Sequence, residues 1–437
     1  MNNAESLRSY WMPFTANAKF AVAPRLFSSA EGMFYTTTDG RPILDAIAGL
    51  WCVNAGHGRR EITDAIKTAA ETLDFVSSFQ MGHPAAFELC RRLSEKAPEG
   101  KGHVFLSNSG SEAVDTALKI ARGYHRSRGE PSRTRFVGRA RAYHGMGWAG
   151  LSVGGIGRHR RDFEPLLPQV SHMRHPYDPQ KSGFSRGLPE WGTDFADDLE
   201  NVLAVHDPTT VAAVIVEPVA GSTGVFAPPR GYLERLRQIC DKHGILLIFD
   251  EVITGFGRLG STFAAKRFGV TPDIITCAKG LSNGAAPIGA TIVRPFIYDT
   301  WMNGARDAIE FSHGYTYSGH PLSCAAALAT MDVFDKEDLW TRGLGIEQMF
   351  EDAAHDLADR NCVRDVRNIG LLAAIDLEPE PGKPGVRAQQ VNAACFEAGV
   401  LIRTTGDTLM ISPPIVAEPA QIDRIFSTLR NAIGTIT

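Results

Sequence analysis

The sequence predicts an α/β protein with a mostly parallel central sheet, helices on both faces of that sheet, and a smaller α+β domain. Two observations support this prediction. Short apolar runs alternate with amphipathic helical stretches from about residue 104 to residue 293, and such alternation is typical of parallel sheets covered on both faces. After about Thr330 the pattern changes to helical stretches that flank two shorter β runs.

The elements of the central region follow from hydrophobic periodicity. A short continuous apolar run predicts a buried strand. The stretch from residue 111 to 122 instead keeps Ala113, Ala117 and Ala121 on one face at helical spacing, and therefore predicts an amphipathic helix. The six predicted strands are residues 104–106, 135–137, 211–216, 245–249, 274–277 and 288–293.

The two ends of the chain differ from this middle part. The N-terminal residues are rich in glycine and aromatic side chains and predict an arm that contributes to the small domain. Near the C-terminus, β runs at 366–376 and 400–412 are separated by a Pro- and Gly-rich loop at 378–385. We expect three units, namely an N-terminal arm at 1–60, a large α/β domain at 61–330 and a small α+β domain at 331–437.

The composition excludes several classes of function. Hydrophobic residues make up 43% and the net charge is −4, which gives no electrostatic reason to bind nucleic acid or an anionic membrane. The first residues lack the apolar core of a signal peptide, and no apolar run is long enough to span a membrane. The seven cysteines include no C-x-x-C pair, so we expect a cytoplasmic protein with reduced thiols and no metal site. The basic cluster at 158–161 has the pattern of a solvated loop.

Two short motifs suggest chemistry that their context does not favour. Gly255, Gly257 and Gly260 form G-x-G-x-x-G, the pattern of an NAD-dependent oxidoreductase, but four residues separate them from the end of the preceding strand. Ser152 lies in G-x-S-x-G, the pattern of a hydrolase nucleophile, but the glycines after it are poor helix formers. We interpret Ser152 as a loop serine and retain the oxidoreductase as a distant alternative.

Polar residues at three strand ends suggest a different site. Asp250 ends the run at 245–249, and Lys279 follows the run at 274–277. An aspartate or lysine at such a place is commonly a helix cap, an ion pair or a solvated charge. Ligands of open α/β sheets, however, bind at the carboxyl ends of the strands, where both side chains would meet. A partly desolvated lysine there has a lowered pKa and can form a Schiff base with an aldehyde.

The third strand end offers an anion site. Ser109, Gly110 and Ser111 stand where the strand at 104–106 stops and the predicted helix begins. Helix N-termini attract anions, although simple N-capping by serine is the common alternative. A lysine, an acid and an anion cradle together match pyridoxal 5'-phosphate, and Tyr143 and His144 offer rings that could lie against the cofactor.

Six motifs spread over nearly the whole chain resemble the class III, fold type I aminotransferases, which depend on pyridoxal phosphate. They are NSGSEA (108–113), RAYHG (141–145), VEPVAG (216–221), FDEVITGFGR (249–258), AKGLSNG (278–284) and HGYTYSGHP (313–321). Two more segments are similar to the ω-amino acid:pyruvate branch of that family, which includes β-alanine:pyruvate and amine transaminases. They are YWMPFTAN (10–17) and GLWCVNAGHG (49–58).

The resemblance implies roles for individual residues. Lys279 would hold the cofactor as a Schiff base, and Asp250 would pair with its ring nitrogen. Arg403 would bind the substrate α-carboxylate, and the substrate pocket would be completed by Trp51, Phe79 and Tyr143. The other cofactor contacts would be Ser109, Gly110, Ser111, Tyr143, His144, Glu217, Val252 and, from a neighbouring subunit, Thr316.

The resemblance also implies an activity and an assembly. The enzyme would move an amino group from an ω-amino acid or primary amine to pyruvate by a ping-pong mechanism. The products would be L-alanine and an aldehyde, semialdehyde or ketone. Small-molecule amines and keto acids would be its partners, in a homodimer with shared active sites or a homotetramer. A 2-oxoglutarate-dependent aminotransferase or an aminomutase on the same scaffold are the alternatives.

Overall fold

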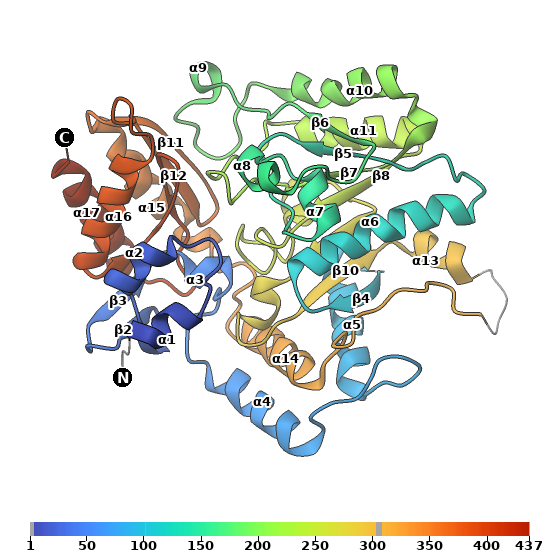
Figure 1. The fold of residues 1–437 in the computed structure, drawn as a ribbon, viewed down its shortest axis with the longest axis horizontal. Coiled ribbons are helices and arrows are strands. Elements are labelled where there is room, and N and C mark those ends of the chain that lie inside the picture. The colour runs from blue at the N-terminus through green and yellow to red at the C-terminus, as the bar shows by residue number, and fades with distance from the viewer. Residues whose placement is uncertain (1–3, 101, 303–307, 437) are drawn as a thin grey trace.

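The computed structural model describes residues 4–100, 102–302 and 308–436, which form two lobes (Figure 1). The larger lobe contains a seven-stranded sheet in the order β4-β10-β9-β8-β7-β5-β6. Strands β6, β5, β7, β8 and β9 are parallel, and β10 runs antiparallel to both of its neighbours. The strands are β4 (His103–Ser107), β5 (Arg135–Arg139), β6 (Val170–Met173), β7 (Val211–Val216), β8 (Leu246–Asp250), β9 (Ile274–Cys277) and β10 (Gly289–Val293).

The predicted, mostly parallel sheet is therefore confirmed, and each of the six predicted strands is present. Strand β6 is the seventh, and the sequence analysis missed it. It is an edge strand of sequence VSHM in which only Met173 is buried, so it has no continuous apolar run.

Helices cover both faces of this sheet because its central strands are apolar on both sides. Ala213 and Ile215 of β7 pack in one buried cluster with α6 (Gly110–Ser127). The alternate residues Val214 and Val216 pack in another cluster with α11 (Tyr232–His243). Successive strand side chains point to opposite faces, which explains this division. The remaining helices of the lobe include α7 (Trp148–Val153), α8 (Gly157–Arg160), α9 (Pro179–Ser182), α10 (Asp198–His206), α12 (Ala264–Phe268) and α13 (Pro295–Met302).

The smaller lobe combines the two ends of the chain. One sheet pairs three N-terminal strands, β1 (Phe27–Glu31), β2 (Phe34–Thr37) and β3 (Pro42–Asp45), with β13 (Val400–Leu401), which runs parallel to β3. The second sheet has the order β11-β12-β15-β14. Its strands are β11 (Val363–Ile369), β12 (Leu372–Leu377), β15 (Thr408–Ile411) and β14 (Arg403–Thr405), and helices α15 (Leu344–His355), α16 (Val386–Glu397) and α17 (Pro419–Gly434) lie beside them.

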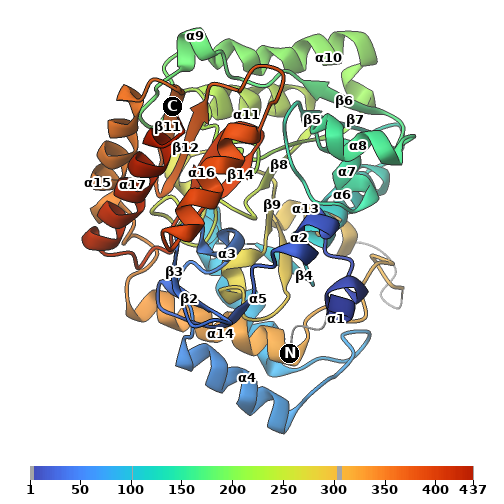
Figure 2. The same ribbon diagram turned by 60° about the vertical axis from the view of Figure 1, so that its left-hand side comes forward.

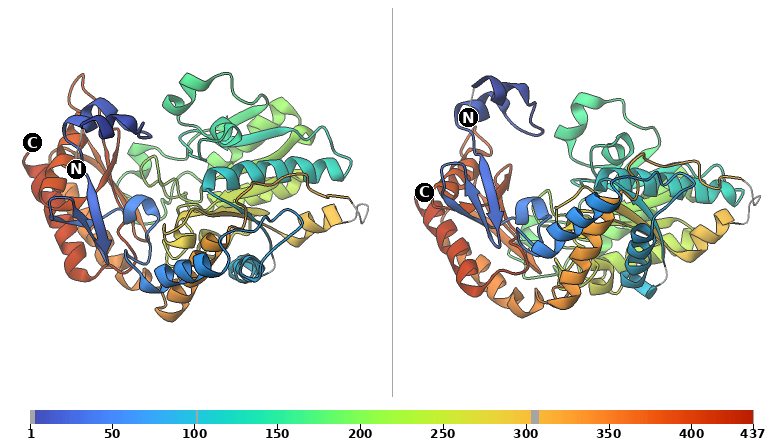
Figure 3. Two further views of the ribbon diagram at one scale, coloured as in Figure 1. Left: turned by 60° about the horizontal axis from the view of Figure 1, so that its bottom comes forward. Right: turned by 90° about the horizontal axis from the view of Figure 1, so that it is seen from below.

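The β3–β13 pairing agrees with an N-terminal arm that contributes to the small lobe, while the domain boundaries stay a prediction. Figure 3 shows the N-terminal segment on the same lobe as the C-terminal helices. Helix α14 passes below both lobes and packs against α4 and α5 (Figure 2). The helices of the N-terminal segment are α1 (Ala4–Ser9), α2 (Asn17–Val22) and α3 (Ala48–Trp51). The three helices that pack together are α4 (Arg60–Thr72), α5 (Pro84–Lys96) and α14 (Pro321–Lys336).

One local prediction was wrong. Ser152 lies in helix α7 rather than in a loop, because the glycines that follow end the helix after Val153 instead of preventing it. Its hydroxyl donates to the carbonyl of Trp148 at 2.5 Å and accepts from the amide of Leu167 at 3.0 Å. None of the helices in the described ranges is long and apolar enough to cross a membrane.

Candidate active site

One cavity lies at the carboxyl edge of the central sheet, where strands β7, β8 and β9 end. Asp250 is the last residue of β8, and Lys279 follows two residues after β9. Both line this cavity together with Glu217, which follows β7. The other lining residues are Gly110, Ser111, Tyr143, His144, Gly145, Val252 and Ile253.

Three donors hold the Asp250 carboxylate in place. The side chain is only 5% exposed, and its Oδ2 lies 2.8 Å from Nδ1 of His144. Its Oδ1 accepts from the amide of Val252 at 3.2 Å and from the hydroxyl of Thr276 at 3.3 Å. The sequence analysis missed Thr276, although it pairs directly with Asp250 across β8 and β9. These contacts fix a buried negative charge that faces the cavity.

Lys279 has an unusual backbone and a perturbed amine. Its φ of +48° is in the left-handed region, which side chains other than glycine seldom adopt and which is frequent at functional sites. Burial lowers the pKa of its ammonium group, and the nearby Asp250 carboxylate opposes this shift only in part. A larger neutral fraction makes the amine a better nucleophile and base.

The start of α6 supplies an anion site beside these groups. Ser111 and Gly110 line the cavity, and a Cβ atom at Gly110 would lie 2.9 Å from Cγ2 of Val252, so only glycine fits there. Helix α6 has 18 residues, and its free amides and dipole favour an anion at this end. Ser109 is the N-cap, with its hydroxyl accepting from the amide of Glu112 at 3.2 Å, and it does not line the cavity.

Glu217 is a second buried acid in the cavity. Its Oε1 accepts from the amide of Tyr143 at 3.0 Å, and its carbonyl accepts from the Arg139 guanidinium at 3.0 Å. Burial raises the pKa of this carboxyl group to about 6. Glu217 therefore binds or releases a proton close to neutral pH, next to the ring of Tyr143.

Trp51 and Arg403 come from the smaller lobe and face Lys279. The Trp51 ring is 2% exposed, and Nζ of Lys279 lies 5.2 Å from its centroid. Cζ of Arg403 lies 5.4 Å from the same centroid. In the described parts of the chain, no carboxylate lies within 4.0 Å of the Arg403 guanidinium, and partial desolvation lowers its pKa although the residue is exposed. The guanidinium is thus an unneutralised cation that could bind a substrate carboxylate.

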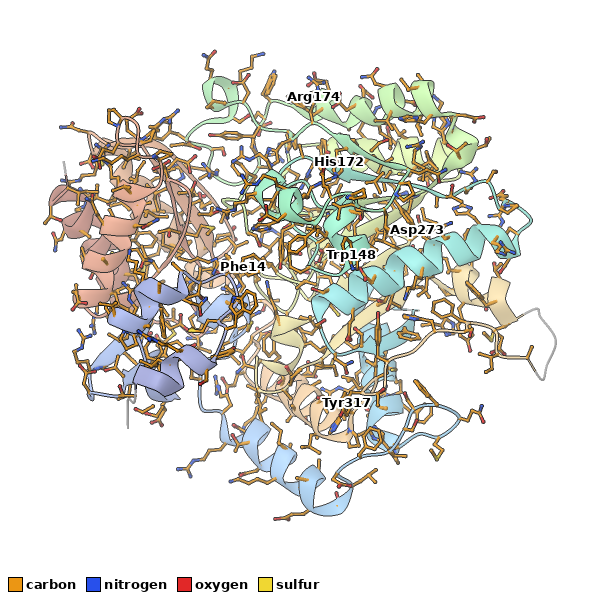
Figure 4. The ribbon with its side chains drawn as sticks, in the orientation of Figure 1. Phe14, Trp148, His172, Arg174, Asp273 and Tyr317 are labelled. Atoms are coloured by element: carbon orange, nitrogen blue, oxygen red, sulfur yellow. The ribbon has the colours of Figure 1, made fainter. Side chains whose placement is uncertain are left out.

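The structure does not bring Phe79 and Thr316 to this cavity. Phe79 is 55% exposed and packs beside Gly314, where a Cβ atom would lie 2.7 Å from its ring. Thr316 is exposed two residues further on. Tyr317, the next residue, is labelled in Figure 4 near α5 and α14. Within one chain, therefore, these two residues lie together on the surface.

A family model described as aminotransferase class-III matches residues 16–433. The chain is a class-III aminotransferase. It is 54% identical over 433 residues to an omega-aminotransferase of Caulobacter vibrioides, covering 99% of each chain. It is 45% identical to a beta-alanine–pyruvate aminotransferase of Pseudomonas aeruginosa, covering 99% of this chain and 96% of the relative. A solved amine transaminase from an uncultivated Pseudomonas species, in its PLP-bound form, superposes with a TM-score of 0.91 at 35% identity, covering 98% and 99% of the two chains.

Class-III aminotransferases use pyridoxal 5'-phosphate, and the residues of this cavity fit that cofactor. A lysine amine suits its aldehyde, the buried Asp250 carboxylate suits its ring nitrogen, and the N-terminus of α6 suits its phosphate. Nε2 of His144 is also buried without a hydrogen-bond partner among the described residues. The family match therefore replaces the distant alternative of the sequence analysis, an NAD-dependent oxidoreductase.

The glycines of the G-x-G-x-x-G motif have a packing role. Gly257 has a φ of +77°, and a Cβ atom there would lie 2.6 Å from the carbonyl oxygen of Leu339. This loop therefore approaches the backbone that follows α14 too closely for any other residue.

Proposed function

We propose that this aminotransferase moves the amino group of an ω-amino acid or primary amine to pyruvate, producing L-alanine and an aldehyde, semialdehyde or ketone. The observation that supports this most directly is the unneutralised Arg403 guanidinium, which contacts the same Trp51 ring as the Lys279 amine. A small keto acid can place its carboxylate on Arg403 while its carbonyl carbon lies near Lys279. The names of the two relatives given above support the same choice of acceptor.

The residues of the cavity divide the work of the reaction. Pyridoxal phosphate, when bound, supplies an electron-withdrawing ring that makes the proton on the amine-bearing carbon acidic. Asp250, fixed by His144, Val252 and Thr276, favours the protonated ring nitrogen. The Lys279 amine removes the proton from the amine-bearing carbon and returns it on the cofactor side, as general base and then general acid. Gly110 and Ser111 would hold the cofactor phosphate.

The enzyme acts as a homodimer, or as a tetramer built from such dimers, because one chain alone leaves part of the site outside its own cavity. Thr316 and Phe79 from a second copy complete the phosphate site and the pocket wall. Their surroundings are an exposed apolar surface of the kind that marks protein interfaces. Its large members are Phe75, Phe79, Met81, Phe87 and Tyr317, which are 41–71% exposed. All seven cysteines are free thiols, which suits a reducing cytoplasm.

The proposal is tested with purified holoenzyme, β-alanine or an arylalkylamine as donor, and pyruvate or 2-oxoglutarate as acceptor. We expect alanine of the L configuration, detected by chiral chromatography, at a rate well above that of glutamate formation. Faster transfer to 2-oxoglutarate, or isomerisation of the donor without an acceptor, would overturn the proposal in favour of one of the two alternative activities.

A further inference from the structure

The basic cluster at 158–161 does not behave as one solvated loop. Arg160 donates to the carbonyls of Ser152 at 3.2 Å and Gly154 at 2.9 Å, and therefore supports the end of α7. Arg161 is exposed and lies beside Asp162 at 3.3 Å. Arg158 differs from both, because its Nη2 crosses to the smaller lobe and donates to the hydroxyl of Thr405 at 3.1 Å.

This contact brings Arg158 to the same face of β14 as Arg403. Side chains two residues apart on a strand share a face, with their Cα atoms about 6.6 Å apart. Arg403 and Thr405 have this spacing, and Thr405 is the residue that Arg158 contacts. The positive charge of Arg158 adds to the effect of burial in lowering the pKa of Arg403, in agreement with their proximity.

Neither guanidinium is neutralised. Throughout the ranges that the structure describes, no carboxylate lies within 4.0 Å of Arg158 or Arg403. Arg367 of the same sheet shows the contrast, since it contacts Asp365 at 2.6 Å and Asp376 at 2.8 Å. Arg158 and Arg403 therefore form a cationic site on one face of the edge strand β14, and no carboxylate of the described residues neutralises it.

The residues around Arg158 place it at the rim of the cavity. The ring of its neighbour His159 lies 5.8 Å from the ring of Tyr143, which lines the cavity. The His159 ring also lies 5.2 Å from the ring of Phe14 of the N-terminal segment, labelled in Figure 4 between the two lobes. Arg158 is thus an exposed residue that contacts β14 at Thr405, two residues from Arg403, and its neighbour His159 lies against a ring of the cavity wall.

We propose that Arg158 binds the distal carboxylate of an ω-amino acid donor whose amine reacts at Lys279, while Arg403 serves the α-carboxylate of the keto acid. The proposal rests on the function proposed above and specifies its donor class. β-Alanine carries its carboxylate close to its amine. Longer donors such as δ-aminovalerate and ε-aminocaproate carry it further from the amine, toward the rim at which Arg158 lies.

The test compares each acid with the amine that lacks its carboxyl group. The donor half-reaction of the holoenzyme is followed by cofactor absorbance, so that no acceptor is needed. The readout is the kcat/KM for ε-aminocaproate divided by that for pentylamine, with β-alanine and ethylamine as the short pair. Arg158→Gln should lower the long-chain ratio about fivefold, the size expected for loss of an exposed ion pair. It should leave the short-chain ratio unchanged.

Two further variants make the result specific. Arg158→Lys keeps the charge and should restore most of the long-chain ratio. Arg161→Gln removes the same charge three residues away, on a side chain that is 78% exposed, and should leave the ratio and the basal activity unchanged. An unchanged ratio in Arg158→Gln, or an equal fall in Arg161→Gln, would overturn the proposal.

An acceptor experiment separates this inference from the function on which it rests. If Arg158→Gln lowers transfer from pentylamine to 2-oxoglutarate relative to pyruvate but leaves the donor ratio intact, Arg158 serves the acceptor and the donor assignment is wrong. If the wild-type enzyme transfers nothing to pyruvate, the proposed function fails, but the donor half-reaction still decides the role of Arg158.

Discussion

Replacing Asp250 with asparagine tests whether a buried charge drives the reaction. The substitution keeps the shape of a side chain that is only 5% exposed and removes the charge facing the ring nitrogen. Opposite charges about 4 Å apart interact by about 4 kcal/mol at an effective dielectric constant of about 20. Because about 1.4 kcal/mol changes a rate tenfold, we expect proton transfer to slow by about 100- to 1000-fold.

The assay is a single donor half-reaction in stopped flow, on protein whose cofactor content has been measured. Asp273→Asn is the matched control, because Asp273 is also buried but contacts Arg237 at 2.7 Å and the amide of Leu247 at 2.8 Å, away from the cavity (Figure 4). It should reduce the melting temperature without changing the rate of the loaded enzyme. A fully loaded Asp250→Asn variant that reacts at nearly the wild-type rate would refute the reasoning.

The other predictions concern four residues. Lys279→Ala should abolish turnover while keeping the fold, and borohydride reduction of the wild-type holoenzyme should label Lys279 in a peptide map; a label on another lysine would contradict the assignment. Arg403→Ala should raise the KM for pyruvate by at least about tenfold, as expected for loss of a bidentate ion pair, and change that for an arylalkylamine little, whereas equal losses would show a structural role. If Thr316 from a second copy binds the phosphate, the holoenzyme should dissociate at lower protein concentration than the apoenzyme in sedimentation experiments, and identical dissociation would count against sharing. The pKa of Glu217 is raised in the folded state from 4.5 to about 6, so the fold binds the extra proton in that window and loses stability as pH rises through it. Glu217→Gln should therefore weaken the fall of the melting temperature with pH between those two values. An unchanged dependence of the melting temperature on pH would argue against a buried, titrating Glu217.

The sequence was sufficient to place Asp250 and Lys279 because apolar runs show where buried strands stop. Parallel strands end at the same edge of a sheet, so two residues that each follow such a run meet there. Strand β6 gave no such signal, since three of its four residues are only half-buried at the sheet edge. Hydrophobic periodicity detects buried strands and misses those that the fold leaves partly open.

Features that depend on packing between lobes could not be predicted from periodicity. The hydrogen bond from Arg158 to Thr405 joins residues separated by most of the chain, and the composition of 158–161 favours a solvated loop. The same limit applies to Trp51, which has a φ of +58° and a ring centroid 5.2 Å from Nζ of Lys279. No sequence pattern predicts that a tryptophan adopts the left-handed backbone conformation.

The rule that places the reactive pair also explains how Trp51 and Arg403 come together. Strands β3 and β13 are parallel, with Asp45 opposite Leu401, so both strands end at the same edge of their sheet. Trp51 is the last residue of helix α3, which follows β3, and Arg403 begins β14, the strand that follows β13. Asp45 supports the start of this helix by accepting from the amides of Ile47 at 3.0 Å and Gly49 at 2.6 Å. Because both residues belong to the smaller lobe, a movement of that lobe would shift them together relative to Lys279. The smaller lobe thus positions Arg403, which would bind the substrate carboxylate, and the central sheet of the larger lobe positions the reactive Lys279.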